Sequence, residues 1–269
     1  MLVIIALMAT APANVLAGLK VHFIDVGQGD SILVESDGCF MLVDAGPWEA
    51  GETVNRYLKD AVPDGTLQAV VATHEHDDHL QGMTNALRGL KVETVYSSRA
   101  VPMSYWFQNI LPVLNQEGLS IQTPQYGDSF SLGAADIRFV NPLAENENSN
   151  NLSLVIRIEY GDTSVLLTAD IESDAELAML EQGVDIHADV LKIAHHGGNT
   201  STSEAFLKAV NPGWAVISVG KGNKHGHPNA EPLNNLARMG ITVYRTDLFG
   251  TVTAVSDGSE WEFQVSRTR

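Results

Sequence analysis

The sequence is poor in two kinds of residue, cysteine and basic side chains. Its one cysteine, Cys39, excludes an intramolecular disulfide and a cysteine-based zinc knot, and its apolar neighbours indicate a buried structural thiol. The 16 lysines and arginines are outnumbered by 33 acidic residues, which gives a formal net charge of −17. Such a surface repels polyanions and argues against a broad nucleic-acid-binding face. It does not exclude chemistry on an anion at a metal site, where divalent cations dominate the local field.

Long apolar runs are also missing beyond the N-terminus, so no membrane span is predicted in the mature chain. Residues 1–17 carry no charge, and an apolar run over Leu2–Ala9 is followed by small residues. Val15 and Ala17 would occupy positions minus three and minus one of a cleavage site. The basic segment that usually precedes such a run is absent. The pattern predicts a signal peptide over residues 1–17 and a secreted or periplasmic protein, with a buried strand or an uncleaved anchor as the alternative.

Residues 18–269 alternate short apolar strands with amphipathic helices, and 44% of the chain is hydrophobic, enough for a sizeable core. A polar, asparagine-rich stretch over Asn141–Asn151 is predicted to join two halves. Helices are predicted at residues 52–62, 79–87, 104–117, 174–182, 203–210 and 231–239, and strands at 19–26, 31–36, 40–44, 67–73, 152–160, 164–168, 189–194 and 215–219, with two more at the end. Because helices can cover one face of the sheet in each half, we predict an α/β (α+β) fold built as a four-layer αββα sandwich.

The segment from Thr73 to His79 is the sharpest functional signal. Its sequence, Thr-His-Glu-His-Asp-Asp-His, places three imidazoles and three carboxylates directly after a predicted buried strand. Imidazole and carboxylate together suit zinc, manganese or iron. Because a surface loop rarely collects so many ligand-type side chains for structural reasons, the segment predicts a metal site.

This His-x-His-x-Asp-His pattern resembles the metal-binding signature of the metallo-β-lactamase superfamily. The resemblance extends over most of the chain and narrows to the hydrolase domain of ComEC-type competence DNA-uptake proteins. The segments that carry it are Phe23–Ser31, Asn151–Val155, Leu166–Asp170, Asp189–Gly197, Ser218–Gly220 and Gly226–Pro228. In the ComEC-type proteins the domain accompanies a membrane channel, and this sequence predicts none. The resemblance implies that residues 18–269 form a single hydrolase domain with the metallo-β-lactamase fold.

The resemblance also implies two divalent metal ions, zinc or manganese. Carried over to this sequence, His74 and His76 hold the first ion. Asp78 and His79 hold the second, and Asp78 is counted among the catalytic residues as well. Because metal ligands of this kind are oriented by further side chains, Asp44 is expected to hold ligands in place, unless it is only a turn residue. Asp25, Gln28 and Asp30 are interpreted as mainly structural.

A bridging carboxylate and a last imidazole are expected from the second half of the chain. Asp170 follows an apolar strand and is predicted to bridge the two ions, with helix capping as the alternative. His195 is predicted to complete the second site. Its neighbour His196 would point elsewhere if strand alternation persists, and it is kept as a candidate catalytic residue.

The chain departs from the wider superfamily at the third ligand of the first site. A histidine is usual there, but the matching stretch offers Asn150 and Asn151. We align Asn151 with that position and keep Asn150 as the alternative. Because an amide oxygen is a weaker ligand than imidazole, the first site is expected to be looser, to take manganese, or to fill only with substrate present.

A glycine-rich loop over residues 218–228 gathers basic side chains in an otherwise acidic protein. It carries Lys221, Lys224 and His227, and begins at Ser218. We interpret these residues as substrate-binding, with His227 as a catalytic residue that protonates the leaving oxygen. A merely solvated loop is the alternative.

Together these features predict a metal-dependent hydrolase in which a hydroxide activated by two metal ions attacks a bound electrophile. The resemblance to a DNA-processing domain and the basic loop favour a phosphodiester substrate, with extracellular DNA and nuclease activity as the specific expectation. Two alternatives stay open. One is a β-lactamase-like or lactonase-like enzyme that acts on a small lactam, lactone or ester, which the acidic surface supports. The other is a non-catalytic metal-binding module.

Overall fold

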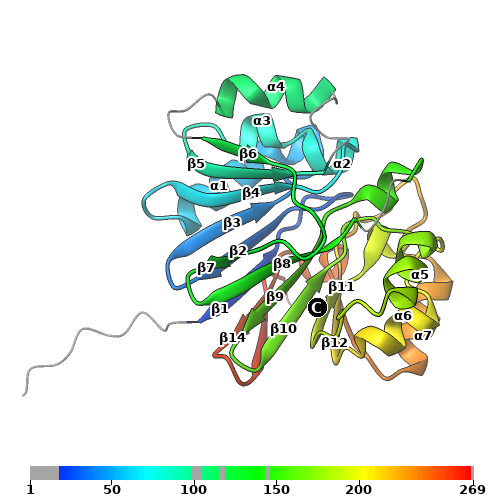
Figure 1. Ribbon diagram of the computed structural model, residues 1–269. Coiled ribbons are helices and arrows are strands. Elements are labelled where there is room, and N and C mark those ends of the chain that lie inside the picture. The colour runs from blue at the N-terminus through cyan, green and yellow to red at the C-terminus, as the bar shows by residue number, and fades with distance from the viewer. Residues whose placement is uncertain (1–17, 99–104, 115–118, 143–145, 268–269) are drawn as a thin grey trace, which may run out of the picture.

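The computed structural model describes residues 18–98, 105–114, 119–142 and 146–267. The predicted signal peptide, residues 1–17, lies outside the described residues. Within the described ranges, no helix has the length and apolar composition that crossing a membrane requires. Two sheets, each covered by helices on its outer face, make up the fold (Figure 1).

The first sheet has eight strands in the order β15-β14-β1-β2-β3-β4-β5-β6. From β3 to β6 the strands are parallel, and the remaining neighbours are antiparallel. The strands are β1 Leu19–Phe23, β2 Ile32–Ser36, β3 Cys39–Val43, β4 Thr66–Ala72, β5 Lys91–Ser97, β6 Ser120–Gln122, β14 Val252–Ser256 and β15 Trp261–Val265. The C-terminal strand β14 pairs with β1, so the end of the chain completes the sheet that its beginning starts.

The second sheet has seven strands in the order β13-β12-β11-β10-β9-β8-β7. Its strands from β10 to β13 are parallel, whereas β7 to β10 are antiparallel. The strands are β7 Ser129–Leu132, β8 Ala135–Asn141, β9 Val155–Tyr160, β10 Thr163–Leu167, β11 Val190–Lys192, β12 Trp214–Ile217 and β13 Thr242–Arg245. Three strands, rather than the two expected from the sequence, therefore follow the last long helix.

Three apolar clusters separate four layers. One lies between the first sheet and its helices, a second between the two sheets, and a third between the second sheet and its helices. The long helices are α1 Gly51–Ala61 and α4 Tyr105–Leu114 on the first sheet, and α5 Ser173–Glu181, α6 Glu204–Val210 and α7 Ala230–Arg238 on the second. This arrangement confirms the predicted αββα sandwich.

Helix α1 illustrates how the sequence fixes these layers. Val54 and Leu58, four residues apart, are fully buried on one face, and each contributes ~1.5–3 kcal/mol by leaving water. Asn55 on the same helix donates to the carbonyls of Ala86 and Arg88 at 2.8 and 2.9 Å. These two hydrogen bonds tie α1 to the segment that follows the predicted metal-binding residues.

The helix predicted over residues 79–87 is divided into α2 Asp77–Leu80 and α3 Met83–Ala86. The division falls at Gly82, whose N–H donates to the Gly46 carbonyl at 2.9 Å. A Cβ at Gly82 would lie 2.1 Å from the Ala45 carbonyl oxygen, so the chain can approach this closely only without a side chain. The contact holds the end of α2 near the end of β3, and α2 carries two of the candidate ligands, Asp78 and His79.

Candidate metal centre

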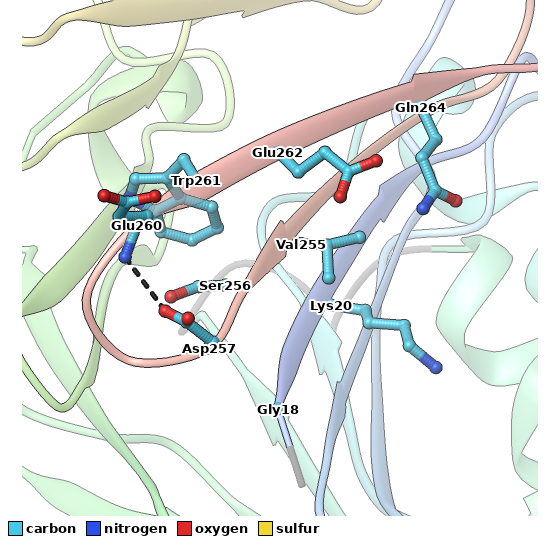
Figure 2. A pocket seen from close by; sticks show the side chains of 9 residues that line it. All are labelled: Gly18, Lys20, Val255, Ser256, Asp257, Glu260, Trp261, Glu262 and Gln264. Carbon is cyan, nitrogen blue, oxygen red and sulfur yellow. Dashed lines mark hydrogen bonds between the residues drawn. The ribbon is translucent and has the colours of Figure 1, made fainter. Parts of the chain in front are cut away.

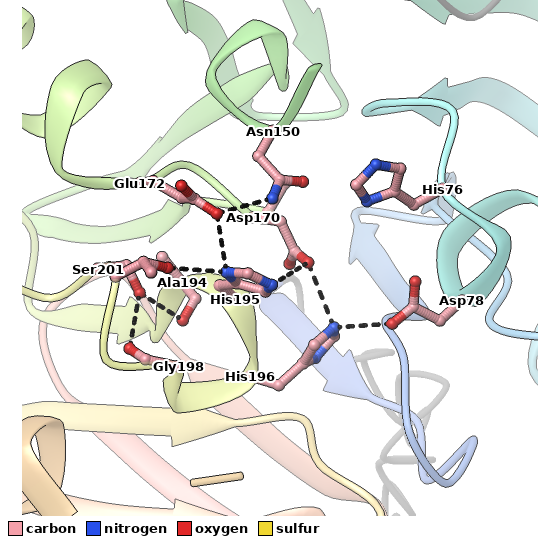
Figure 3. Close-up of polar contacts among 12 residues, drawn as sticks. His76, Asp78, Asn150, Asp170, Glu172, Ala194, His195, His196, Gly198 and Ser201 are labelled. Atoms are coloured by element: carbon pink, nitrogen blue, oxygen red, sulfur yellow. Dashed lines mark hydrogen bonds and ion pairs between the residues drawn. The ribbon is translucent and has the colours of Figure 1, made fainter. Parts of the chain in front are cut away.

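Four of the six predicted ligands line a cavity of about 870 Å³ at the edge where strands of both sheets end. The first half of the chain contributes His76 and Asp78, and the second half contributes Asp170 and His195 (Figure 3). Because β4, β10 and β11 end just before these residues, the segments at the carboxyl ends of the strands supply the side chains. The two sheets thus bring residues that are far apart in the sequence to one site.

One buried carboxylate, Asp44, holds two of the imidazoles. It accepts from His79 Nδ1 at 2.7 Å and from the Thr73 hydroxyl at 2.7 Å. The same hydroxyl oxygen lies 3.1 Å from His74 Nδ1. With both Nδ1 atoms engaged, Nε2 of His74 and Nε2 of His79 are left buried without a hydrogen-bond partner. The structure therefore places Asp44 where the sequence predicts an orienting residue, and it leaves two nitrogens free for a metal.

Asp170 lies between the imidazoles of the two halves. Its Oδ2 is 3.3 Å from His79 Nε2, 3.5 Å from His196 Nε2 and 4.0 Å from His195 Nε2. Helix α5 begins at Ser173 with Glu172 at its N-cap position, so Asp170 does not cap the helix as the alternative interpretation had it. A carboxylate in this central position can contact ions on both sides, as the predicted bridging role requires.

The two adjacent histidines differ from the expectation. Strand β11 ends at Lys192, and His195 and His196 have φ angles of 50° and 54° in the left-handed region. Strand alternation therefore stops before these residues, and the expectation that His196 points away is wrong. His196 Nε2 lies 3.3 Å from Asp78 Oδ2, and Nδ1 lies 2.9 Å from the Ser218 carbonyl oxygen, so Nε2 is left for a metal. Ligand atoms of Asp78, His79 and His196 all lie within 4.8 Å of one another.

His195 occupies a different place from the predicted completion of the second site. Its side chain is 25% exposed and lines the cavity. Nδ1 lies 3.4 Å from Glu172 Oε1 and 3.2 Å from the Thr200 hydroxyl, which turns Nε2 toward Asp170 (Figure 3). Burial lowers the pKa of this imidazole, so the neutral form is favoured. His195 is thus a neutral side chain at the cavity wall.

The first-ion residues are less tightly held. His76 Nε2 lies 3.1 Å from the Ser149 hydroxyl, which leaves Nδ1 as its free nitrogen. Asn151 uses its amide oxygen to accept from the Glu172 N–H at 2.9 Å. Asn150 donates its amide to Glu172 Oε1 at 2.9 Å, and its own oxygen is buried without a partner. The free amide oxygen therefore belongs to Asn150, the alternative, and not to Asn151.

The histidines near the cavity differ in how readily they bind a proton. Burial alone would lower the pKa of His196, but the Asp170 and Asp78 carboxylates outweigh it and raise the pKa to about 10. The same balance, with Asp170 as the strongest anion, holds the pKa of His79 well above its usual value. Burial keeps the pKa of His74 well below its usual value. In the metal-free protein a cation at His79 and His196 must therefore displace protons, whereas one at His74 need not.

The basic loop over residues 218–228 reaches the cavity in part. Lys224 and His225 line it, whereas Lys221 is exposed and is not among the lining residues. Ser218 takes part through its carbonyl, which accepts from His196 Nδ1. The His227 ring lies 5.5 Å from the His195 ring, centroid to centroid. Burial and the neighbouring histidines lower the pKa of His227 to about 4, so its imidazole is neutral near pH 7.

Two buried residues near the centre carry charges that the sequence analysis does not assign to function. Asp30, interpreted there as mainly structural, has Oδ1 at 3.5 Å from His196 Nδ1. Its Oδ2 lies 2.5 Å from Nζ of Lys192. A lysine inside the apolar strand Val190–Lys192 is a signal that could have been used, because a buried ammonium requires a charged partner.

Another cavity, of about 410 Å³, lies beside β1, β14 and β15 (Figure 2). Its charged lining residues are Lys20, Asp257, Glu260 and Glu262, and no histidine lines it. The Asp257 side chain accepts from the backbone N–H of Glu260 at 3.0 Å and so belongs to the turn between β14 and β15. This cavity offers no set of metal ligands.

The donor atoms beside the first cavity fit a metal centre. Among the described residues, buried side-chain atoms without a hydrogen-bond partner include Nε2 of His74, His79 and His196 and the amide oxygen of Asn150. Oδ2 of Asp170 lies within 3.5 Å of two of these nitrogens. Buried polar atoms are normally paired, so such a convergence indicates groups whose partner is a ligand. Imidazole nitrogens with carboxylate oxygens are the donors that zinc and manganese accept.

The fold and the sequence match known proteins. A family model described as the metallo-beta-lactamase superfamily matches residues 24–221. Among solved structures, the metallo-beta-lactamase fold protein YhfI from Bacillus subtilis aligns with a TM-score of 0.58 and 17% identity, covering 85% of this chain and 96% of that chain. At this identity the likeness concerns the fold alone.

Two curated relatives match most of the chain, and one of them is a competence protein by name. ComE operon protein 3 of Bacillus subtilis (strain 168) is 32% identical over 251 residues, which are 87% of this chain and 32% of that protein. Competence protein ComA of Neisseria gonorrhoeae is 30% identical over 230 residues, which are 85% of this chain and 31% of that protein. The chain thus spans about a third of the length of these relatives.

Proposed function

The chain belongs to the metallo-β-lactamase superfamily, whose members are generally metal-dependent hydrolases, and we propose that it hydrolyses phosphodiesters, with DNA as the candidate substrate. Buried donor atoms that converge on Asp170 carry the metal-dependent part of this proposal. The likeness to competence proteins and the basic side chains at the cavity support the phosphodiester part.

Two sets of side chains flank Asp170 and would hold two divalent ions, zinc or manganese. The first set would be His74, His76 and the amide oxygen of Asn150. The second would be Asp78, His79 and His196, whose ligand atoms lie within 4.8 Å of one another. When bound, such ions supply activation of water and neutralisation of the negative charge that develops during attack. An amide oxygen in the first set favours manganese more than a third imidazole would.

The basic side of the cavity would bind the substrate. Lys224 and His225 can contact phosphate oxygens, while Glu75 and Asp77 line the same cavity and repel an anion placed beside them. A phosphodiester would therefore be drawn toward the loop over residues 218–228. This polarity orients the substrate before attack.

His227 would carry the proton for the leaving oxygen. In the free protein its pKa of about 4 leaves it neutral. A phosphate anion beside the ring favours the protonated form and raises that pKa, so substrate binding itself would load the proton. His195, neutral and oriented by Glu172, would stay at the cavity wall and contact the substrate rather than the leaving group.

A substrate panel tests the proposed activity. Metal-free protein is reconstituted separately with zinc and with manganese and assayed on bis-p-nitrophenyl phosphate, DNA, a chromogenic cephalosporin and a lactone. Turnover of the phosphodiesters is expected. Turnover of the cephalosporin or the lactone alone would replace the proposal with a lactam or ester hydrolase, and bound metal without any turnover would indicate a binding module.

Export is a separate proposal. Residues 1–17 would direct secretion, and extracellular DNA would then be within reach of the enzyme. Fractionation of expressing cells with N-terminal sequencing tests it. A product that keeps residue 1 and stays in the cytosol would contradict it.

A further inference from the structure

A lysine lies directly beneath the candidate metal centre. Lys192 is the last residue of β11, and its side chain is fully buried. Val190, two residues earlier, packs in the apolar cluster between the sheets, whereas Leu191 packs under the helices. Strand alternation therefore directs Lys192 between the two sheets, at the edge where the ligands gather.

The Lys192 ammonium has three oxygen neighbours. Nζ lies 2.5 Å from Asp30 Oδ2, donates to the Ala169 carbonyl at 3.0 Å and lies 3.8 Å from Asp170 Oδ1. Burying an ammonium is unfavourable unless it is paired and hydrogen-bonded, and here the pairing crosses from the second sheet to the loop before β2. A position this costly requires a role that an apolar side chain would not fill.

Two of these contacts, to Ala169 and Asp170, act on the bridging carboxylate. Ala169 has a φ of 47°, a left-handed conformation that non-glycine residues rarely adopt, and it directly precedes Asp170. Its carbonyl accepts from both Lys192 Nζ and the His195 N–H, at 3.0 and 3.1 Å. Lys192 thus holds the backbone that aims Asp170 and attracts the Oδ1 atom, while Oδ2 faces the imidazoles.

We propose that Lys192 is a positioning residue of the metal centre, which holds the Ala169 carbonyl by a hydrogen bond and attracts Oδ1 of Asp170 by its charge, so that Oδ2 is presented to the metals. Asp30 is its counter-ion and lies 3.5 Å from His196 Nδ1, so the pair supports the second-ion set from two directions. The inference rests on the two-ion site of the proposed function. It adds a buried cation, and removal of this cation is expected to weaken metal binding by the second-ion set more than by the first.

Metal titration of a substituted protein tests this role. Lys192→Met keeps the length of the side chain and removes the charge. Zn²⁺ and Co²⁺ are titrated into metal-free protein against a chelator, and the visible Co²⁺ spectrum reports each site. We expect second-ion affinity to fall by about 10–100-fold, as for other residues that orient ligands, and first-ion affinity, which the bridging Asp170 also supports, to fall by less. Asp30→Asn, which still accepts a hydrogen bond, should shift the same affinity by less.

Arg157→Met is the matched control. Arg157 is a buried cation on β9 of the same sheet, 2.7 Å from Glu159 and outside the cavity lining, so its loss tests the general effect of removing such a charge. It should bind both ions with wild-type affinity. Equal affinities in wild type and Lys192→Met, or equal losses at both sites, would overturn the positioning role. The positioning role would also be overturned if Lys192→Met and Asp30→Asn fail to fold while Arg157→Met folds, because Lys192 would then be purely structural.

The titration of the wild type tests the two-ion site itself. If the wild-type protein binds only one ion, the two-ion site is overturned, and the inference with it.

Discussion

The two halves of the metal centre are built in different ways. In the early half, residues 73–79 follow one strand, and one carboxylate, Asp44, orients His74 and His79. In the late half, ligands are spread over residues 150–196, and each is held by a partner from elsewhere, such as the Ser218 carbonyl for His196. The difference teaches that neighbouring ligands in a contiguous motif can share one orienting partner, here Asp44, whereas dispersed ligands each need a partner that the packing of the whole fold supplies.

The largest expected effect separates the two neighbouring histidines of the late half. His196→Ala should lose the second ion and reduce hydrolysis to background, because Nε2 of His196 lies with the Asp78 carboxylate. His195→Ala should keep both ions. Metal content by elemental analysis, beside rates, distinguishes them. His187→Ala, at an exposed position, is the control and should behave as wild type. Loss of metal from His195→Ala alone would reverse the assignment of the late half.

The next effect concerns His227, which the late half brings beside His195. His227→Ala should lower the rate on DNA by ~10²–10⁴-fold with metal content intact, because a general acid is lost. The loss should be smaller on bis-p-nitrophenyl phosphate, since p-nitrophenolate leaves without a proton. Equal losses on both substrates would exclude the general-acid role, and missing metal would make His227 a ligand.

Metal affinity measured at several pH values distinguishes the two ion sites, because a metal ion must displace a proton from His196 but not from His74. The pKa of His196 is about 10 in the metal-free protein, so a metal must displace its proton near pH 7, and second-ion affinity should rise with pH. The rise should be about tenfold per pH unit for each proton displaced, up to about pH 10. His74, with its lowered pKa, adds no such dependence to the first ion. Chelator competition at several pH values measures both, and a pH-independent second ion would contradict the expected proton exchange.

The smallest effect concerns the first-ion set. Asn150→His should raise zinc affinity by about tenfold, because an imidazole would replace the weaker amide oxygen that is free in this structure. Asn151→His is the matched control. It should not raise affinity, since the Asn151 oxygen already accepts from the Glu172 N–H. A gain from Asn151→His and none from Asn150→His would restore the alignment expected from the sequence.

Particular residues show where sequence reasoning succeeded and where it failed. The four-layer fold was predictable because strand and helix periodicities persist through each element, as in α1. The direction of the His196 side chain was not predictable from periodicity. The strand pattern in the sequence continues to residue 194, but β11 ends at Lys192 and the backbone is left-handed at His195 and His196. Asn150 and Asn151 are adjacent and chemically identical, so the sequence cannot tell which of them offers a free amide oxygen. The structure distinguishes them, because Asn150 donates to the Glu172 carboxylate whereas the Asn151 oxygen accepts from the Glu172 N–H.

By itself the sequence determined the fold class and the contiguous cluster from His74 to His79, because both depend on residues close together in the chain. The tertiary structure decided which histidine joins Asp78, which asparagine offers a free oxygen and that Lys192 meets Asp30. These outcomes depend on left-handed backbone at the end of a short strand and on contacts between the two sheets. Local periodicity carries no information about either, since both arise only when distant segments pack together.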